Sequence, residues 1–441
     1  MKKLAIIGGG AAGLAAAVAA GEALRTRGSA APAVEVVLYE ADDRVGRSVL
    51  ATGNGRCNFS NACVEATHYR NATFVGEVLQ VLRRQHAALA EHGNANADAS
   101  ANADAGESTN PRANSEDPVH AFFANAGLEW REDDEGRLYP FTNKASTVLD
   151  VLRAACAAVG VREECGNAVS QVVPPQHEGE RFHLRFADGA IEHAEVVIVA
   201  CGGRRFEGLL PESYQTVAMQ PVLGPLRTFG KVAKSLDNIR VRAALALVGS
   251  DGVVKAHEEG ELLFRSYGVS GIAVFNLSRF ACPGDTLLID LLPFVSASHC
   301  ESYLFSRRKR LAAQGQSLTA EAYLRGLLLP PVASVVLKQA KLHPEMAFRK
   351  SDVAALAVAL KALPLKIEGI GEARQCQVTR GGLAVNNFDA ATLESRWDKG
   401  LFVVGEAFDV DAPCGGYNLH WAWASGLVAG RYAAARARRD R

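Results

Sequence analysis

The chain has 441 residues with 48 basic and 48 acidic side chains, and 48% of its residues are hydrophobic. This length and composition predict two or three domains with large cores, and no apolar run long enough to cross a membrane. The lack of such a run predicts no membrane partner, and because the net charge is zero, we expect no nucleic-acid partner either. Nine scattered cysteines without a C-x-x-C pair predict a cytoplasmic protein with neither a disulfide framework nor a metal site.

The first predicted elements are a strand over residues 3–7, a glycine turn, and a helix over about 14–27. Gly8 allows a tight turn, Gly10 lets the backbone approach a pyrophosphate, and Gly13 lets the helix pack close to the strand. The helix start points free N–H groups and a positive dipole end at the phosphates. This pattern is typical of a Rossmann-like dinucleotide site.

A second strand is predicted over residues 34–39, and it ends at Glu40. The carboxylate of Glu40 is placed to hydrogen-bond ribose hydroxyls, although it lies farther beyond Gly13 than the usual ~20 residues. The loop over residues 28–32 accounts for the extra length.

Two other interpretations of the N-terminus stay open. Lys2 and Lys3 before an alanine-rich run are also compatible with a signal peptide that is cleaved near residues 17–19. Three consecutive glycines would interrupt the helix of such a peptide, and cleavage would remove the first strand. The alanine-rich helix is also compatible with a core helix that has no functional role.

A glycine-rich loop over residues 46–58 is the next candidate. Its backbone donors and flexible glycines suit a position beside the pyrophosphate and ribityl chain of a cofactor. Cys57, with Cys63 nearby in the sequence, allows a redox interpretation. We favour a structural or flavin-packing role for Cys57.

Residues 94–118 are low in complexity and cannot bury enough apolar area to offset the entropy of ordering. They are predicted to be a disordered surface insertion, with a functional arm as the alternative. Globular patterns then return as a helix over 145–159, strands over 168–173 and 181–186 with a turn at 188–189, and a buried strand over 194–200. That last strand ends at Cys201-Gly202-Gly203, a second glycine end facing the cofactor.

Near the C-terminus, a strand leads to residues 405–406, and two glycines at 415–416 open a helix near Tyr417. The dipole of this helix is placed to face the N1/O2 edge of a flavin, where negative charge builds on reduction. The alternative is an ordinary buried helix with Trp421 and Trp423 in the core, which leaves residues 405–406 unexplained. A dinucleotide that needs glycine turns from both ends of the chain is FAD rather than NAD.

The middle of the chain does not have a doubly wound pattern. Short strand-like runs, such as 243–248 and 286–291, indicate a β-rich insertion, and residues 296–362 have a helical pattern. The predicted domains are an FAD-binding domain (1–203 plus 376–441), a β-rich substrate domain (204–295 plus 363–375) and a helical insertion (296–362). No second G-x-G-x-x-G occurs, so we expect no dedicated NAD(P)H domain.

These motifs together resemble the aminoacetone-oxidase-like family of bacterial NAD(P)/FAD-dependent oxidoreductases, which includes the 3-dehydro-bile-acid Δ4,6-reductases. The matching segments occur in the family's order over nearly the whole chain: 8–13, 51–58, 136–140, 260–264, 268–271, 378–382 and 405–423. The resemblance implies an α/β fold with a Rossmann-like FAD-binding domain, a β-barrel-like insertion and a small helical insertion. Ile272 and Cys414 depart from the family pattern. Because of Ile272, the resemblance does not extend to the family's substrate, whereas the expectation of FAD binding is unaffected.

The fingerprint and the resemblance together give the set of expected FAD contacts. They are Gly8, Gly10, Ala11, Ala12, Gly13, Glu40, Arg47, Thr52, Gly53, Gly55, Arg56, Cys57, Asn58, Val169, Ala200, Gly202, Gly405, Glu406, Gly415, Gly416, Tyr417, Asn418 and Leu419. No catalytic residue is assigned. Tyr267, His343 and Tyr417 are candidates for a general acid, although each is more readily structural.

The expected function is that of an FAD-dependent oxidoreductase that passes a hydride from NAD(P)H, a transient donor, through the flavin to an unsaturated small organic substrate. An amine oxidase that uses oxygen is the first alternative. An RNA-modifying enzyme or a non-catalytic flavin-binding protein is the alternative from another class.

Overall fold

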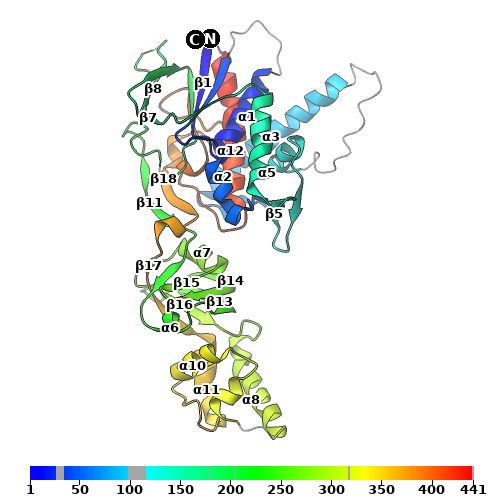
Figure 1. The fold of residues 1–441 in the computed structure, drawn as a ribbon, viewed down its shortest axis with the longest axis vertical. Helices are drawn as coiled ribbons and strands as arrows, with labels where there is room; N and C mark the ends of the chain where they lie inside the picture. Colours follow the sequence, from blue (N-terminus) through cyan, green and yellow to red (C-terminus); the bar gives the residue numbers. More distant parts are fainter. Residues whose placement is uncertain (26–33, 98–115, 178, 204, 316–317, 440–441) are drawn as a thin grey trace. The chain divides into compact units, whose positions relative to one another are not determined.

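The computed structural model describes residues 1–25, 34–97, 116–177, 179–203, 205–315 and 318–439 (Figure 1). The chain divides into two compact units, Met1–Gln220 with Val378–Arg441, and Pro221–Gln377. Residues 205–220, which the sequence assigned to the β-rich domain, fall in the first unit. The reason is a long-range pairing of β11 (Thr216–Val222) with β18 (Val378–Leu383) in a two-stranded sheet. The predicted loop over 28–32 lies outside the described residues.

A parallel sheet forms the centre of the first unit, in the order β19-β10-β1-β2-β6. Its strands are β1 (Lys2–Ile7), β2 (Val34–Glu40), β6 (Arg162–Cys165), β10 (Val196–Val199) and β19 (Leu401–Val403). Every pair in the sheet is parallel. The central strands are apolar and buried, as expected for a parallel sheet that is covered on both faces. The expected first two strands are therefore confirmed.

The first and last helices of the chain pack side by side, as the blue and red ribbons in Figure 1 show. They are α1 (Ala11–Arg25) and α12 (Tyr417–Arg438). A Cβ atom on Gly426 or Gly430 would lie 2.4 Å from the carbonyl oxygen of Ala12 or Ala16. The two helices thus approach so closely that these positions of α12 accept only glycine, and this contact holds the two ends of the chain together.

Further helices and two small antiparallel sheets complete the first unit. The helices are α2 (Arg47–Ala51), α3 (Ala72–Ala97), α4 (Pro118–Asn125) and α5 (Ala145–Ala158). One sheet has the order β3-β5-β4, with β3 (Ser60–Asn61), β4 (Trp130–Glu132) and β5 (Arg137–Pro140). The other has the order β7-β8-β9, with β7 (Val169–Val173), β8 (Phe182–Phe186) and β9 (Ile191–Ala194). The predicted hairpin strands and the helix over 145–159 are confirmed.

The predicted insertion over 94–118 is too long at both ends. Helix α3 continues through Ala97. Asparagines and alanines alternate over residues 94–97, and the high helix propensity of alanine offsets the lower propensity of asparagine. At the other end, Asp117 caps α4, where its Oδ1 accepts hydrogen bonds from the N–H groups of Val119 (2.9 Å) and His120 (3.1 Å). Aspartate followed by proline is a helix-start signal that the composition of the segment obscured. Residues 98–115 lie outside the described residues.

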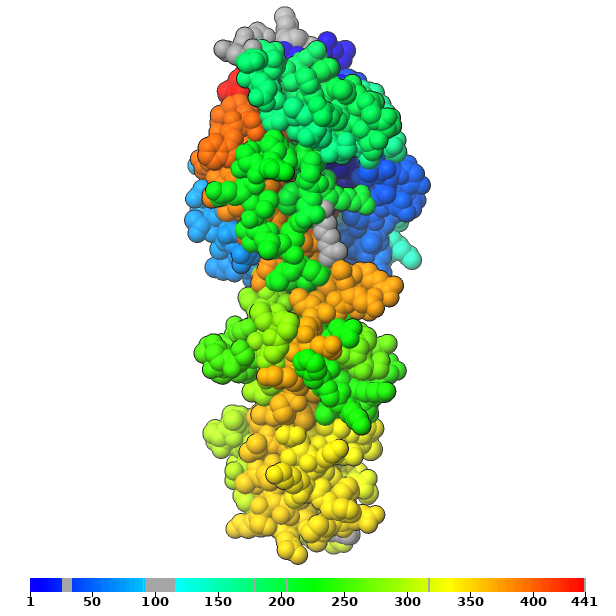
Figure 2. All heavy atoms as spheres, turned by 90° about the vertical axis from the view of Figure 1, so that its left-hand side faces the viewer, coloured from blue at the N-terminus to red at the C-terminus, as the bar shows by residue number. Residues whose placement is uncertain are grey.

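The second unit contains a closed barrel with the strand order β12-β15-β14-β13-β16-β17. Its strands are β12 (Leu226–Thr228), β13 (Arg240–Val248), β14 (Val254–Arg265), β15 (Gly268–Ser270), β16 (Thr286–Asp290) and β17 (Leu363–Ile370). The helices of this unit are α6 (Val232–Ser235), α7 (Ile272–Ser278), α8 (Ala297–Ala313), α9 (Ala320–Leu324), α10 (Pro330–Gln339) and α11 (Val353–Lys361). Helices α10 and α11, yellow in Figure 2, pack against each other and share one core with the barrel.

The expected fold class is therefore confirmed: a Rossmann-like α/β domain with a barrel and helices. None of the helices in the described part of the chain has the length and hydropathy that a membrane crossing requires.

Candidate functional site at the carboxyl edge of the sheet

The glycine turns of the first unit follow neighbouring strands of the parallel sheet. Ile7 of β1 lies opposite Tyr39 of β2 and Val199 of β10, and Val199 lies opposite Val403 of β19. Because these strands are parallel, their carboxyl ends meet at one edge of the sheet. Nucleotides bind in this position in open α/β sheets. Residues from both ends of the chain therefore lie at the same edge of the sheet.

The glycines of the first turn are required for two different reasons. Gly8 has a φ of 106°, and a Cβ atom on it would lie 2.6 Å from the oxygen of Ala200. A Cβ atom on Gly13 would lie 1.9 Å from the oxygen of Gly8. Gly10 instead meets only the side-chain oxygen of Ser48, at 3.2 Å, and its φ is not in the left-handed region. The protein itself does not require glycine at position 10, and the free space there fits a closely approaching pyrophosphate.

The carboxylate of Glu40 is buried at the turn and fixed by two backbone donors. Its Oε2 accepts a hydrogen bond from Gly9 N–H at 2.8 Å, and its Oε1 accepts one from Asp42 N–H at 2.9 Å. Arg205 places Nη1 4.0 Å from the same carboxylate. This position at the end of β2 matches the one predicted for a ribose-binding acid.

The loop over 46–58 folds mainly through its own backbone. Gly53, Asn54, Gly55 and Cys57 all have left-handed φ values, between 55° and 80°. Within the loop, the Thr52 hydroxyl donates to Val49 O at 2.6 Å, and Arg56 Nε donates to Gly53 O at 3.2 Å. Arg47 forms exposed ion pairs with Asp42 and Asp43 at 3.4 and 3.5 Å. Four left-handed residues within five positions present backbone groups rather than side chains to a neighbour.

The environment of Cys57 favours a structural role. Its side chain is fully buried, and burial raises the pKa of the thiol to about 11, although a hydrogen bond with Thr52 opposes the shift. At neutral pH this thiol is protonated and therefore a poor nucleophile. Cys63 is exposed.

A direct contact joins the glycine-rich loop to the C-terminal turn. With the amide of Asn58 in its hydrogen-bonded orientation, its oxygen accepts from Gly416 N–H at 3.0 Å and its nitrogen donates to Ser60 O at 2.8 Å. Gly416 has a φ of 96°, and a Cβ atom on it would lie 2.2 Å from Ser60 O. The start of α12 is therefore fixed against β3 without room for a side chain.

The remaining polar groups of the C-terminal block also have defined partners. Glu406 Oε1 accepts a hydrogen bond from Thr379 N–H at 2.6 Å. The amide of Asn418 donates to Ala412 O at 2.9 Å and accepts from Ala412 N–H at 3.0 Å. Trp421 is buried and donates from Nε1 to Gly405 O at 3.0 Å, so the core role proposed for this tryptophan is correct. The same bond places residue 405 beside α12.

The other predicted residues lie after β10, at the start of β7 or in the second unit. Ala200 and Gly202 follow β10, and Gly202 has a left-handed φ of 79° with open space around it. Val169 begins β7, just after Asn167, whose N–H donates to Glu40 O at 3.0 Å. Tyr267, His343 and Ile272 all belong to the second unit.

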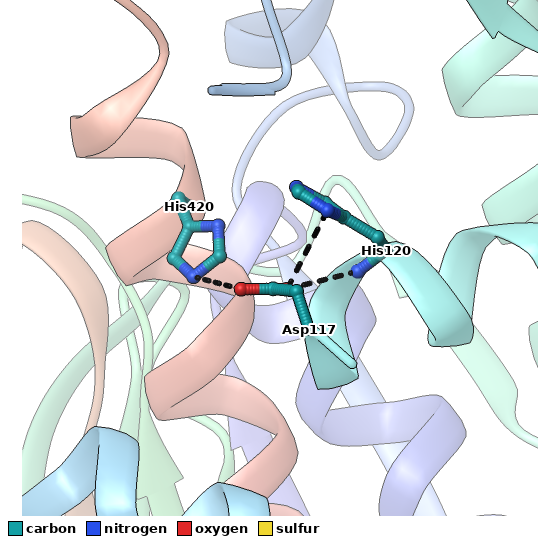
Figure 3. Close-up of side chains that lie close together, drawn as sticks. All are labelled: Asp117, His120 and His420. Atoms are coloured by element: carbon teal, nitrogen blue, oxygen red, sulfur yellow. Dashed lines mark hydrogen bonds and ion pairs between the residues drawn. The ribbon is translucent and has the colours of Figure 1, made fainter. Parts of the chain in front are cut away.

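Sequence reasoning missed a buried polar cluster beside the start of α12. Its members are Ser60, Asp117, His120 and His420, three of which are drawn in Figure 3. Burial lowers the pKa of His420 to about 4 and also lowers the pKa of His120. Burial alone would raise the pKa of Asp117, but the histidines and two backbone N–H groups keep it below its ordinary value. The helix-start signal at Asp117-Pro118 was the only local indication of this cluster.

Comparisons with known proteins place the chain in a family. The family described as the HI0933-like protein Rossmann domain matches residues 102–432. The 3-dehydro-bile acid delta(4,6)-reductase of Clostridium scindens is 30% identical, over 99% of this chain and all of its own. The ribosomal RNA dihydrouridine synthases of Escherichia coli and Haemophilus influenzae are 28% and 27% identical, each over 95% of both chains.

Among solved structures, the 3-ketosteroid-delta4-(5alpha)-dehydrogenase of Rhodococcus jostii is 14% identical. It aligns over 100% of this chain and 97% of its own with a TM-score of 0.44, a likeness too weak to carry an argument. The family match and the full-length relatives carry the assignment. The chain belongs to the HI0933-like Rossmann family and is an FAD-dependent oxidoreductase.

Proposed function

We propose that this oxidoreductase reduces a carbon–carbon double bond conjugated with a carbonyl group in a small organic substrate, with NAD(P)H as the transient electron donor. The likeness to the delta(4,6)-reductase over the whole chain is the observation that carries the proposal. The names of both kinds of relative describe one chemistry, because dihydrouridine also arises when a double bond beside a carbonyl is saturated. The substrate class rests on these relatives.

The residues at the carboxyl edge would hold FAD in a defined order. The first turn of α1, together with Gly10, would bind the pyrophosphate, since a helix start leaves N–H groups without helical acceptors. Glu40 would bind a ribose. The loop over 46–58 and the start of α12 would bind the flavin half, and the helix dipole would stabilise negative charge there. Bound FAD would supply the two-electron chemistry.

The sequence contains a single glycine fingerprint, so we expect the electron donor and the substrate to bind in turn at one face of the cofactor. This order predicts ping-pong kinetics, in which a higher concentration of one substrate raises the apparent KM for the other. A separate nucleotide site would instead give converging double-reciprocal plots.

One anaerobic experiment tests the proposed function. The purified yellow protein is mixed with NADH, NADPH or a primary amine, and the flavin absorbance is followed. The bleached protein is then mixed with oxygen or with a cyclic enone. We expect bleaching by a nicotinamide and rapid recovery with the enone. Bleaching by an amine, with rapid recovery in oxygen, would establish the amine oxidase alternative.

An RNA substrate is the second candidate, and a local feature of the second unit favours it. Residues 307–310 of α8 are a continuous basic run, Arg-Arg-Lys-Arg. Arg307 and Arg308 donate hydrogen bonds to backbone carbonyls, but Lys309 and Arg310 are exposed. A balanced net charge does not exclude such a local basic surface, which is where phosphate contacts arise.

The two candidates are separated by charge reversal. If RNA is the substrate, Lys309→Glu with Arg310→Glu should weaken binding of a ribosomal RNA fragment at least tenfold and flatten its salt dependence. Lys399→Glu, an exposed change in the first unit, is the matched control. Enone reduction should remain unchanged in both variants. If the wild-type protein does not bind the fragment at low salt, RNA is not the substrate.

A further inference from the structure

We propose that Asp117, His120 and His420 bind one divalent transition-metal ion, which clamps the start of α12 to α4. The sequence had predicted no metal site. The proposal does not depend on the proposed substrate, because the cluster is assembled entirely from side chains of the first unit.

Three potential ligand atoms converge on one small space. Asp117 Oδ2 lies 3.8 Å from His420 Nε2, and Asp117 Oδ1 lies 3.9 Å from His120 Nδ1. One ligand atom from each residue lies within 4.8 Å of the others, and Figure 3 shows both rings turned toward the carboxylate. Two ligands on a tetrahedral zinc ion lie about 3.4 Å apart, so the widest pair must close by up to about 1.4 Å. Small side-chain rotations supply such a shift.

The outer nitrogens of the two rings provide the second, independent observation. His120 Nε2 and His420 Nδ1 each lie 2.8 Å from the hydroxyl oxygen of Ser60, which is fully buried. That hydroxyl also lies 3.4 Å from Asn61 O. A hydroxyl accepts two hydrogen bonds and donates one. We assign the tautomers in which both rings donate to Ser60 and Ser60 donates to Asn61 O, since this choice forms all three bonds.

This tautomer assignment leaves the inner nitrogens without protons. Two buried nitrogen lone pairs and the carboxylate of Asp117, whose side chain is 24% exposed, then face one another, and a cation between them would relieve their repulsion. Metal-bound histidines usually donate their other N–H to a fixed acceptor, and Ser60 serves both rings in this way.

The donor set indicates the kind of ion. Two imidazoles and one carboxylate suit zinc and its first-row neighbours rather than calcium or magnesium, which prefer oxygen ligands. The position indicates a structural role, because His420 lies in the first turn of α12 and its N–H donates to Gly416 O at 2.9 Å. Ser60 belongs to β3, against which Gly416 packs. The ion would therefore hold in place the same helix start that is proposed to contact the flavin.

Metal content tests the site without reference to activity. The full-length, FAD-loaded protein is dialysed against micromolar Zn²⁺ or Co²⁺ and then against metal-free buffer, and bound metal is measured by mass spectrometry. We expect one ion per chain in the wild type and none in His420→Gln or Asp117→Asn. The melting temperature should rise with zinc only in the wild type.

Two further variants serve as controls for the metal measurement. His183 and His193 form an exposed pair on neighbouring strands, with ring centroids 4.6 Å apart, which could take up metal adventitiously. Replacing both with glutamine must leave the ion in place. Ser60→Ala keeps all three ligands and should weaken zinc affinity 10- to 100-fold while FAD content is retained. If His420→Gln does not fold, Ser60→Ala and Asp117→Asn decide the question. Metal content in the wild type no higher than in these variants would overturn the proposal.

Discussion

The two glycine-rich helix starts meet at one edge of the sheet but need their glycines for different reasons. At the start of α1, Gly8 and Gly13 are required by contacts with the protein's own backbone, whereas a Cβ atom on Gly10 would meet only the side-chain oxygen of Ser48. At the start of α12, Gly416 combines a left-handed φ with a backbone contact to Ser60. A glycine that the protein itself does not require is the one most informative about a ligand. Gly10 is therefore the position that best separates folding from cofactor binding.

The largest effect is expected at Gly13. In Gly13→Val the new side chain would meet the carbonyl of Gly8, only 1.9 Å from the ideal Cβ position, so α1 cannot stay against β1. We expect a loss of more than about 3 kcal/mol of stability in the first unit. Gly369→Ala, where nothing lies within 4 Å of the added atom, is the control. Chemical denaturation monitored by circular dichroism measures both, and a Gly13→Val protein as stable as the control would contradict the packing argument.

Gly10→Val should reduce FAD binding and leave the stability of the apoprotein nearly unchanged. Its Cβ meets only the flexible side chain of Ser48, so the apoprotein should unfold within a few degrees of the wild-type apoprotein. FAD content should nevertheless fall more than tenfold, because the side chain occupies the space that the pyrophosphate needs. Released FAD per chain, measured after denaturation, checks this. Normal FAD content in Gly10→Val would mean that the cofactor does not lie at the start of α1.

Local signals predicted the parts of the site that are continuous in sequence. The glycine turn, the end of β2 at Glu40 and the start of α12 each have a pattern that backbone geometry requires. The Asp117–His120–His420 cluster was not predictable, because its members come from the start of α4 and from α12, and Asp117 follows a low-complexity segment. The barrel order β12-β15-β14-β13-β16-β17 was likewise hidden, since strand pairing far along the chain depends on packing rather than on local sequence.

At Gly416 a matched pair of variants is needed. From the sequence alone, Gly416→Asp would be a charge test, but any side chain here is strained by the left-handed φ, at about 1–3 kcal/mol, and its Cβ atom must also displace Ser60 O, only 2.2 Å away. Gly416→Ala carries the strain without the charge. An aspartate at this cap position would otherwise favour α12 by about 1 kcal/mol.

The difference in FAD affinity between Gly416→Asp and Gly416→Ala therefore reports the effect of the added charge on the bound flavin. If the flavin lies at this helix start, Gly416→Asp should bind FAD more weakly than Gly416→Ala, even where its apoprotein is the more stable of the two. Equilibrium titration of both apoproteins with FAD gives the two dissociation constants. Equal or tighter binding by the aspartate variant would exclude the flavin from the start of α12.

The smallest effect concerns the two cysteines near the glycine-rich loop, and it decides whether they can form a redox pair. With the pKa of Cys57 raised to about 11 by burial, only about 0.1% of this thiol is ionised at pH 8, and it is also shielded from reagents. Cys63 is exposed. Alkylation of the native protein at pH 8, followed by peptide mass spectrometry, should therefore modify Cys63 and leave Cys57 intact until denaturant is added.

Cys57→Ala should lower stability by about 1–2 kcal/mol and leave turnover within about twofold of the wild type, because it removes a small buried side chain. A redox role would require the reverse: rapid labelling of Cys57 in the reduced native protein, and loss of turnover in both Cys57→Ala and Cys63→Ala.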